Sequence, residues 1–247
     1  MPAVRTFADL DALTRAAADE LVAIAATAIA ARGRCHVALS GGSTPRRLFQ
    51  HLAGRPAELP WDRIDLWWGD ERCVPPDHAD SNYGAARALL LEPLGARGPA
   101  EARVHRIHGE LDPGASARAY EDELIAALGS PPVLDLAIQG MGPDGHTASL
   151  FPGSPALDED RRYVVANPVR SPLVAGGEAT RITLTAPAIN AARRIRFLAA
   201  GADKAEPLAA VLEGPRDPHR YPSQLIAGPD VAWLVDTAAA ARLRGAP

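Results

Sequence analysis

The sequence predicts an α/β fold: a single-domain, doubly wound and mainly parallel sheet with helices on both faces, similar to a Rossmann fold. Two observations lead to this prediction. Short apolar runs suited to buried strands alternate with helical patterns along the whole chain, which is typical of parallel strands joined by helices. No internal repeat or linker divides the 247 residues, a length that one large α/β domain accommodates. We therefore expect one domain over residues 1–247.

Composition narrows the classes of function. The chain has 26 basic and 30 acidic residues, a formal net charge of -4 and no basic block, so neither nucleic acid nor an anionic membrane is an expected partner. Residues 16–31 are alanine-rich, but Asp19 and Glu20 interrupt them, which argues against a signal peptide or a transmembrane span. Cys35 and Cys73 are too few for a disulfide framework or a zinc site. These features predict a cytoplasmic protein with reduced thiols and no bound metal.

The first half of the chain predicts alternating helices and strands. An amphipathic helix over 9–31 ends at a glycine, and a strand over 35–40 leads into a helix whose first turn holds Pro45, a favourable position for proline. Ser43 or Thr44 is the expected cap of that helix. The other elements expected in this half are a strand over 64–68, a helix over 81–91, a strand over 104–107 and a helix over 113–128.

The second half continues the alternation. An apolar strand over 133–139 precedes a glycine-rich loop. A segment over 168–180 that contains proline and glycine is expected to be a loop that is either near the site or mobile. The other elements expected in this half are strands over 163–166, 181–184, 195–200 and 231–235, helices over 185–192 and 203–212, and a terminal helix.

The stretch 140–152 carries the strongest functional pattern. It follows an apolar strand at the carboxyl end, where open α/β sheets bind ligands, and it presents Asp144 and His146 two residues apart. A histidine with a nearby carboxylate is the smallest set for a general base with a group that orients it or holds its charge. The alternative is a histidine that is only packed or exposed, which its place beside Asp144 on a glycine loop disfavours.

The glycines of this loop allow another interpretation. Gly140, Gly142 and Gly145 match the G-x-G-x-x-G pattern of dinucleotide-binding sites. That pattern requires a long helix directly after the turn, whereas Pro143 interrupts the turn and the Phe-Pro-Gly-Ser-Pro run at 151–155 stops any helix. A dinucleotide site is therefore disfavoured.

A second candidate binding segment precedes the helix that contains Pro45. Gly41, Gly42, Ser43 and Thr44 form a turn at a helix N-terminus, where free backbone N–H groups and the helix dipole favour an anion. The turn lacks the lysine of a nucleotide-binding P-loop, so a nucleotide is not implied. A simple tight turn between strand and helix is an equally good interpretation.

Two further strand ends carry charged groups. Asp70, Glu71 and Arg72 follow one apolar strand, although a solvated turn with surface ion pairs is the alternative. Lys204 stands in the first turn of a predicted helix, where its charge opposes the macrodipole and a bound phosphate would remove the conflict. Because parallel strands bring such ends to one edge of a sheet, we expect all four polar segments to line a single pocket.

Taken in chain order, these motifs resemble the 6-phosphogluconolactonase family. The similarity covers nearly the whole chain, and the motif at 140–152 is highly specific. It implies hydrolysis of 6-phospho-D-glucono-1,5-lactone to 6-phospho-D-gluconate, the second step of the oxidative pentose phosphate pathway. A sugar-phosphate lactone is then the small-molecule partner, with no metal or organic cofactor. The residues that carry the resemblance are Ser40–Pro45, Asp70–Arg72 with Val74–Pro75, Ser81–Asn82, Gly140–Pro152, Arg181–Thr185, and Gly201 with Lys204.

The implied chemistry needs few groups. A δ-lactone is an activated ester, so a positioned water, a base and a stabilised oxyanion suffice. We expect His146 to take a proton from the water that attacks C1, while Asp144 or Asp70 holds the imidazole. Backbone N–H groups of the turn at 41–42 or the Arg72 side chain are expected to meet the oxyanion.

The phosphate of the substrate is expected to lie against Lys204 and Arg181, with Arg72 as an additional candidate. Binding there fixes the substrate far from the reacting carbon. In the segment 169–179 the family usually has a shorter, proline-containing approach to the next strand, which leaves the role of Arg170 open.

Two alternatives share the predicted fold. In glucosamine-6-phosphate deaminases the motif at the position of residues 145–152 is similar to Gly-His-Ile-Ala-Phe-Asn-Glu-Pro. The glutamate of that motif is absent from residues 145–152 of this chain. A sugar-phosphate sensor would ordinarily carry a DNA-binding helix-turn-helix and a basic surface, and the sequence has neither pattern. We expect the protein to be a monomer or a weak homodimer.

Overall fold

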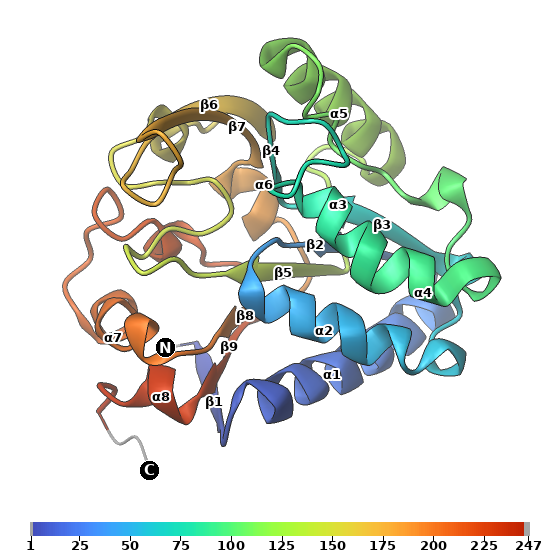
Figure 1. Ribbon diagram of the computed structural model, residues 1–247, viewed down its shortest axis with the longest axis horizontal. Coiled ribbons are helices and arrows are strands. Elements are labelled where there is room, and N and C mark those ends of the chain that lie inside the picture. Colours follow the sequence, from blue (N-terminus) through green and yellow to red (C-terminus); the bar gives the residue numbers. More distant parts are fainter. Residues whose placement is uncertain (1, 245–247) are drawn as a thin grey trace.

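The computed structural model describes residues 2–244 and has the predicted α/β architecture (Figure 1). Its main sheet has six parallel strands in the order β1-β9-β8-β5-β2-β3. The prediction of a mainly parallel sheet is confirmed. The strands are β1 (Ala3–Phe7), β2 (Cys35–Leu39), β3 (Ile64–Trp68), β5 (Leu136–Gly140), β8 (Ile195–Ala199) and β9 (Val231–Asp236).

Strand β1 has no counterpart among the predicted elements. It lies at one edge of the sheet and pairs only with β9. Three of its five residues are exposed, because an edge strand is covered on one side only. A short strand without a continuous apolar run has no periodicity that distinguishes it from a loop.

A second sheet, which is antiparallel, corrects the prediction for the region 163–184. It consists of β4 (Asp70–Arg72), β7 (Glu178–Leu184) and β6 (Val164–Arg170), in that order. The strands expected over 163–166 and 181–184 belong to this sheet, and the expected loop over 168–180 shrinks to 171–177. Pro168 does not end the strand, because β6 is an edge strand and an edge tolerates a missing N–H donor.

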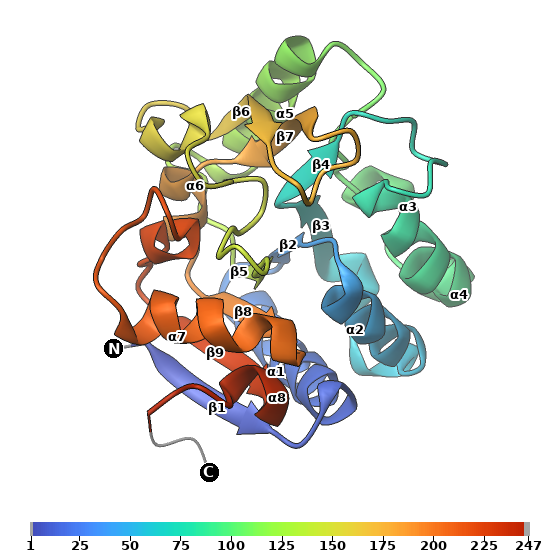
Figure 2. The same ribbon diagram turned by 60° about the vertical axis from the view of Figure 1, so that its left-hand side comes forward.

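The helices follow the predicted order. Helices α1 and α2 lie side by side in both ribbon views (Figures 1 and 2). The helix expected over 81–91 is split, because α3 continues through a π-helical turn before α4. The segment 104–107 is not a strand, and only an isolated bridge joins Val104 to Leu66. The bounds are α1 (Leu10–Arg32), α2 (Ser43–Ala53), α3 (Asn82–Ala86), α4 (Glu92–Leu94), α5 (Pro113–Leu128), α6 (Ala186–Asn190), α7 (Ala205–Glu213) and α8 (Thr237–Ala240).

Large aromatic side chains on β3, β8 and β9 fill the core. Trp67, Trp68 and Trp233 are each at most 2% exposed, and the Phe197 ring stacks on Trp233 with centroids 3.8 Å apart. Burying one side chain of this size contributes about 1.5–3 kcal/mol relative to leaving it exposed. This burial stabilises the positions of β3, β8 and β9 in the sheet.

The chain reverses its direction across the sheet at β2. From β2 it continues to β3 on one side, and it later returns to place β5 on the other side of β2. In open α/β sheets such a switch point leaves a crevice outside the carboxyl ends of the two strands, and ligands bind there. The segments that follow β2 and β5 are those at 40–45 and 140–152.

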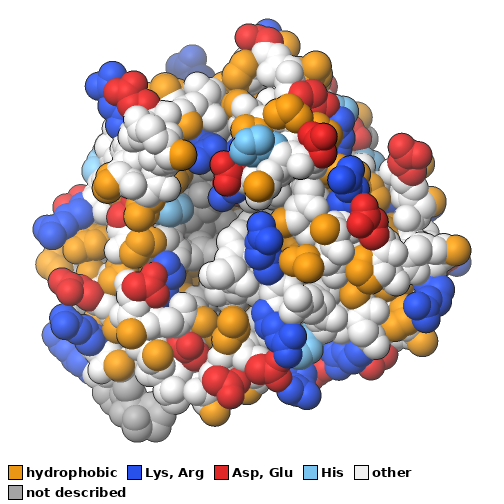
Figure 3. All heavy atoms as spheres, in the orientation of Figure 1, with side chains coloured by type: hydrophobic (Ala, Val, Ile, Leu, Met, Phe, Trp, Pro, Cys, Tyr) orange, Lys and Arg blue, Asp and Glu red, His pale blue; other side chains and the backbone are white. Residues whose placement is uncertain are grey.

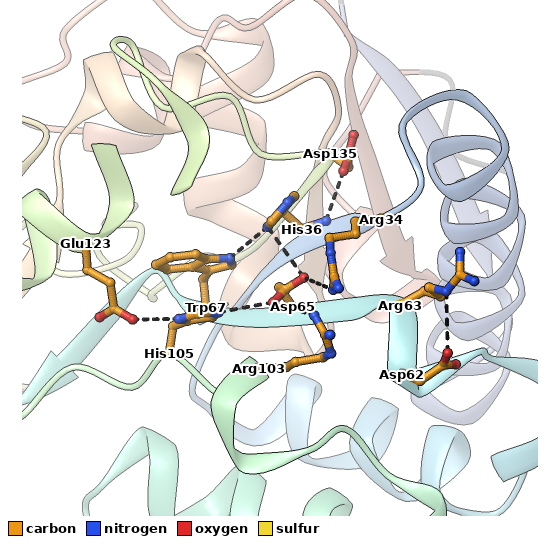
Figure 4. A network of polar contacts seen from close by, with 10 residues as sticks. All are labelled: Arg34, His36, Asp62, Arg63, Asp65, Trp67, Arg103, His105, Glu123 and Asp135. Atoms are coloured by element: carbon orange, nitrogen blue, oxygen red, sulfur yellow. Dashed lines mark hydrogen bonds and ion pairs between the residues drawn. The ribbon is translucent and has the colours of Figure 1, made fainter. Parts of the chain in front are cut away.

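A network of charged and aromatic side chains lies beside β2 and β3 and includes His36, Asp65 and Trp67 of these strands (Figure 4). The Asp65 carboxylate is buried and contacts His105 Nε2 at 3.2 Å and an Arg34 nitrogen at 3.2 Å. The His105 ring stacks on Trp67 with centroids 3.9 Å apart, and its Nδ1 is 2.6 Å from Glu123 Oε1. His105 thus bridges two carboxylates.

This bridge predicts that stability falls at alkaline pH. Burial alone lowers the pKa of His105, but the hydrogen bonds to Asp65 and Glu123 outweigh it and raise the pKa from 6.5 to about 9. The stabilisation is fully present below about pH 6.5 and is lost as pH rises through about 9. Over this range we expect the wild-type protein to lose about 1–2 kcal/mol more unfolding free energy than the His105→Gln variant loses. This figure is smaller than the pKa shift alone implies, because Glu123 is half exposed and solvent screens its charge.

Urea denaturation at about pH 6 and about pH 10 measures the difference between the two proteins. Comparing wild type with His105→Gln cancels the other groups that titrate in this range. Equal losses in both proteins would show that the charge of His105 does not stabilise the fold.

Candidate active site

A cleft of about 250 Å³ lies at the carboxyl ends of β2 and β5. The space-filling view shows this face hollowed near its middle, with basic side chains around the hollow (Figure 3). The structure brings eight of the ten residues expected in the site to the cleft wall. They are Gly41, Gly42, Ser43, Thr44, Asp70, Arg72, His146 and Lys204.

Asp144 lies directly behind His146. Its Oδ1 is 2.5 Å from His146 Nδ1 and also accepts a hydrogen bond from the His146 backbone N–H at 3.1 Å. Burial alone raises the pKa of the Asp144 carboxyl, but the hydrogen bond and charge of His146 outweigh it and lower this pKa. Because Nδ1 is engaged with a carboxylate, Nε2 is the ring nitrogen left for a ligand in the cleft.

The ring of His146 is held on two further sides. The Phe151 ring stacks on it with centroids 4.1 Å apart and planes at 19°. A Cβ atom added to Gly142 would overlap the imidazole at Nδ1 and Cε1, so only glycine fits there. The Gly142 N–H also donates to the His146 carbonyl at 2.8 Å. Packing therefore fixes the orientation of the imidazole before any ligand binds.

Helix α2 begins without a side-chain cap. The capping residue is Gly42, at φ 104°, and no side chain bonds to the first turn, so the expected capping by Ser43 or Thr44 is wrong. Glycine takes this φ at no steric cost, whereas serine or threonine would be strained. The first N–H groups of the helix have no partner within the helix and lie in the cleft wall, where they can receive an anion.

No hydrogen bond or ion pair joins Asp70 to His146. Its buried carboxylate accepts hydrogen bonds from Ser149 Oγ at 2.6 Å and from Asn82 Nδ2 at 3.1 Å. Of the two carboxylates expected to hold the imidazole, Asp144 is the one bonded to it. Asp70 instead links Ser149, near the end of the 140–152 loop, to Asn82, the first residue of α3.

Glu71 supports the same corner of the cleft and was not among the expected site residues. Its buried carboxylate accepts the backbone N–H groups of Arg72, Asn82 and Tyr83 at 2.7–2.8 Å and the Ser81 hydroxyl at 3.1 Å. Burial raises the pKa of Glu71, although the three N–H donors act against this. The carboxylate fixes the backbone at both Arg72 and Asn82.

Two cations line the cleft. Arg72 donates a hydrogen bond to the Asp80 carbonyl. Lys204 pairs with Asp203 at 2.8 Å, and its side chain is 19% exposed. Lys204 is also the only lysine in a chain with 26 basic residues. Every other Lys or Arg position is arginine, so the one lysine of the chain lies in the cleft wall.

The other two candidate arginines lie outside the cleft lining. Arg181 stands opposite Arg72 in the β4–β7 ladder, and burial, followed by the positive charge of Arg72, lowers the pKa of its guanidinium. Arg170 pairs with Glu178 at 2.9 Å, and its side chain is 84% exposed. Arg181 therefore adds positive charge next to Arg72 on the neighbouring strand, whereas Arg170 faces solvent.

Asn82 and Leu173 line the cleft but were not assigned a role from the sequence. The Asn82 amide occupies the space where any Cβ on residue 41 would lie, which explains Gly41. Leu173 belongs to the 171–177 loop and is 48% exposed. Ser81-Asn82 was a visible motif, but nothing near residue 173 in the sequence indicates that it reaches this cleft.

Residues 2–244 contain neither a metal-binding cluster nor a membrane-spanning helix. This part of the chain contains no group of three or more His, Cys, Asp or Glu side chains suited to a metal ion. None of its helices combines the length and apolar character that crossing a membrane requires.

Comparison with known proteins places this chain in a family. Residues 8–234 match the family model described as glucosamine-6-phosphate isomerases/6-phosphogluconolactonase. The chain is 41% identical over 247 residues to a 6-phosphogluconolactonase of Nostoc sp., covering 97% of this chain and 98% of that one. It is 39% identical over 251 residues to that of Mycobacterium tuberculosis, with the same coverage.

Solved structures agree. The 6-phosphogluconolactonase from Trypanosoma cruzi is 30% identical with a TM-score of 0.85, covering 98% of this chain and 97% of that one. A monomeric glucosamine-6-phosphate deaminase has a TM-score of 0.80 at 22% identity, covering 97% of this chain and 99% of that one. The second likeness concerns the fold alone.

Proposed function

Because the chain belongs to the family of glucosamine-6-phosphate isomerases and 6-phosphogluconolactonases, we propose that it hydrolyses 6-phospho-D-glucono-1,5-lactone to 6-phospho-D-gluconate. The observation that carries the proposal is the His146–Asp144 pair in a cleft that also contains Lys204. A base with an oriented imidazole and a separate cation match a substrate with an ester at one end and a phosphate at the other.

The reaction proceeds by direct attack of water. His146 Nε2 takes a proton from the water as its oxygen bonds to C1, and Asp144 stabilises the imidazolium that forms. The bond between C1 and the ring oxygen then breaks, and the imidazolium returns the proton to that oxygen. The charge on the C1 oxygen is met by the N–H groups at the start of α2, which need no reorganisation because the helix fixes them.

The phosphate binds Lys204, with Arg72 as the second cation of the cleft and Arg181 adding positive charge behind it. A dianionic group gains most where cations have few other partners. Lys204 has one carboxylate neighbour, Asp203, which is largely exposed. The restriction of lysine to this one position supports a specific role for its compact ammonium.

The deaminase shares the fold but lacks support from the site residues. The loop after His146 reads Thr-Ala-Ser-Leu-Phe-Pro and contains no acidic residue before Asp158. One assay separates the two activities: loss of the phosphorylated lactone above its spontaneous hydrolysis, with ammonia release from glucosamine 6-phosphate measured in parallel. Accelerated lactone loss without ammonia supports the proposal, and the reverse result overturns it.

The fit between Gly142 and the imidazole gives a testable prediction. Gly142→Ala places a methyl group where the ring lies, so the ring must leave its contact with Asp144. We expect the lactonase rate to fall about 10-fold, since displacements of about 1 Å in a catalytic group have effects of this order or larger. Steady-state kinetics with purified protein measure it.

Gly54→Ala is the matched control for this substitution. An added Cβ at Gly54 makes only ordinary contacts, the nearest at 3.4 Å, and its φ is -71°. It should leave the rate unchanged. Full activity in Gly142→Ala would show that catalysis does not depend on the observed position of the His146 ring next to residue 142.

A further inference from the structure

A turn from the carboxyl-terminal part of the chain is bonded to the loop that carries His146. The turn comprises residues 217–225 and ends in a 3₁₀ helix, Pro222–Leu225. The Ser223 backbone N–H and its Oγ both donate to the Gly145 carbonyl, at 2.9 Å and 2.8 Å. The peptide group that joins Gly145 to His146 is thus held by two hydrogen bonds from one residue.

The same turn shapes the loop by packing. Gly145 has φ 79°, and a Cβ there would lie 2.8 Å from a ring carbon of Tyr221. The Gly153 N–H donates to the His219 carbonyl at 3.1 Å, which ties the far end of the loop to the turn. Ser223 is 2% exposed, so water does not replace its hydrogen bonds.

The other side of the turn is attached to α7 (Figure 2). The Gln224 side-chain amide donates to the carbonyls of Ala210 and Val211 near the end of that helix, at 3.2 Å and 3.3 Å. Its Oε1 accepts the Asp217 N–H at 2.6 Å, which closes the turn on itself. The turn therefore joins the His146 loop to a helix, a rigid element that loop residues alone would not provide.

We propose that Ser223 is a positioning residue for His146, and that it acts through the Gly145 peptide. This inference rests on the proposed function, in which His146 is the base. The turn at 217–225 anchors the backbone of His146, while Asp144 and Phe151 hold its ring. Ser223 touches no substrate in this scheme: it does not line the cleft, so its loss changes the efficiency of the base and leaves substrate binding intact.

Ser223→Ala tests the proposal, because it removes the Oγ bond and retains the N–H bond. We expect kcat to fall about fivefold for both 6-phosphogluconolactone and unphosphorylated gluconolactone, with KM for each within about twofold of wild type. A loss in kcat alone, equal on both substrates, is the signature of a misplaced base. A purely structural role would lower thermal stability and leave kcat per folded molecule unchanged.

Ser116→Ala is the matched control. Ser116 lies on α5 and is also 2% exposed, and its hydroxyl has no hydrogen-bond partner within the described residues. Its loss should leave kcat unchanged. Gln224→Ala serves as a second variant should Ser223→Ala not fold, with about a twofold loss of the same kind expected from loosening the attachment to α7.

Wild-type kcat in both folded variants, or a loss confined to the phosphorylated substrate, would overturn the proposal. These outcomes differ from failure of the proposed function. In that case the wild-type protein would not accelerate lactone hydrolysis, or His146→Ala would retain the full rate.

Discussion

His146→Ala is expected to leave the fold intact and to lower the enzyme-dependent rate of lactone hydrolysis by about 10²–10⁴-fold, the usual contribution of a positioned general base. The side chain is 19% exposed and its removal loses the stacking on Phe151, but the space that it leaves opens to the cleft and lies outside the main hydrophobic core. KM should change less than kcat, because the proposed phosphate contacts are left in place.

The measurement is the initial rate of lactone loss after subtraction of spontaneous hydrolysis. His108→Ala is a suitable control, since His108 is half exposed and outside the cleft. It should have the wild-type rate. A His146→Ala variant with near-wild-type activity would remove His146 from the mechanism and leave the Asp144 contact without a catalytic role.

The sequence predicts those site residues that directly follow the carboxyl end of a strand. Asp144 and His146 are two residues apart on one loop, so the local pattern suffices to pair them. The turn at 41–44 and Lys204 join them because parallel strands end at the same edge of the sheet. A strand pattern followed by glycine therefore indicates the position as well as the chemistry of a segment.

Contacts between distant segments leave no such pattern. Asp70 bonds to Ser149, which is 79 residues away, and Ser223 bonds to Gly145, which is 78 residues away. From the sequence Asp70 is as good a partner for the imidazole as Asp144. Only the fold shows that its carboxylate is directed to a hydroxyl and an amide instead.

The second sheet was missed for a different physical reason. Proline and glycine around 168–177 favour a loop when each residue is judged alone. The hairpin forms because β7 offers partners to both β4 and β6 and because Val169 and Val174 pack with Phe151. Tertiary packing outweighs local propensity here, and it also holds the residue that stacks on His146.

Lys204→Ala separates phosphate recognition from chemistry more clearly than any other substitution. An ammonium that binds a phosphate in a partly buried cleft contributes roughly 1.5–3 kcal/mol, so kcat/KM for the phosphorylated lactone should fall by about 10–100-fold. The rate on unphosphorylated gluconolactone should hardly change, because that substrate never made the contact. A surface lysine without this role would change stability by about 0.5 kcal/mol or less and neither rate.

Arg170→Ala provides the matched control, since its side chain is 84% exposed and outside the cleft, and both rates should stay at the wild-type value. Because Lys204 is the only lysine, methylating it with a labelled reagent also gives a single side-chain signal that 6-phosphogluconate should shift.

An equal loss on both substrates in Lys204→Ala would mean that the residue acts on the reacting centre or on folding. Unchanged rates on both would move the phosphate to Arg72 and Arg181, the two cations that face each other across the β4–β7 ladder.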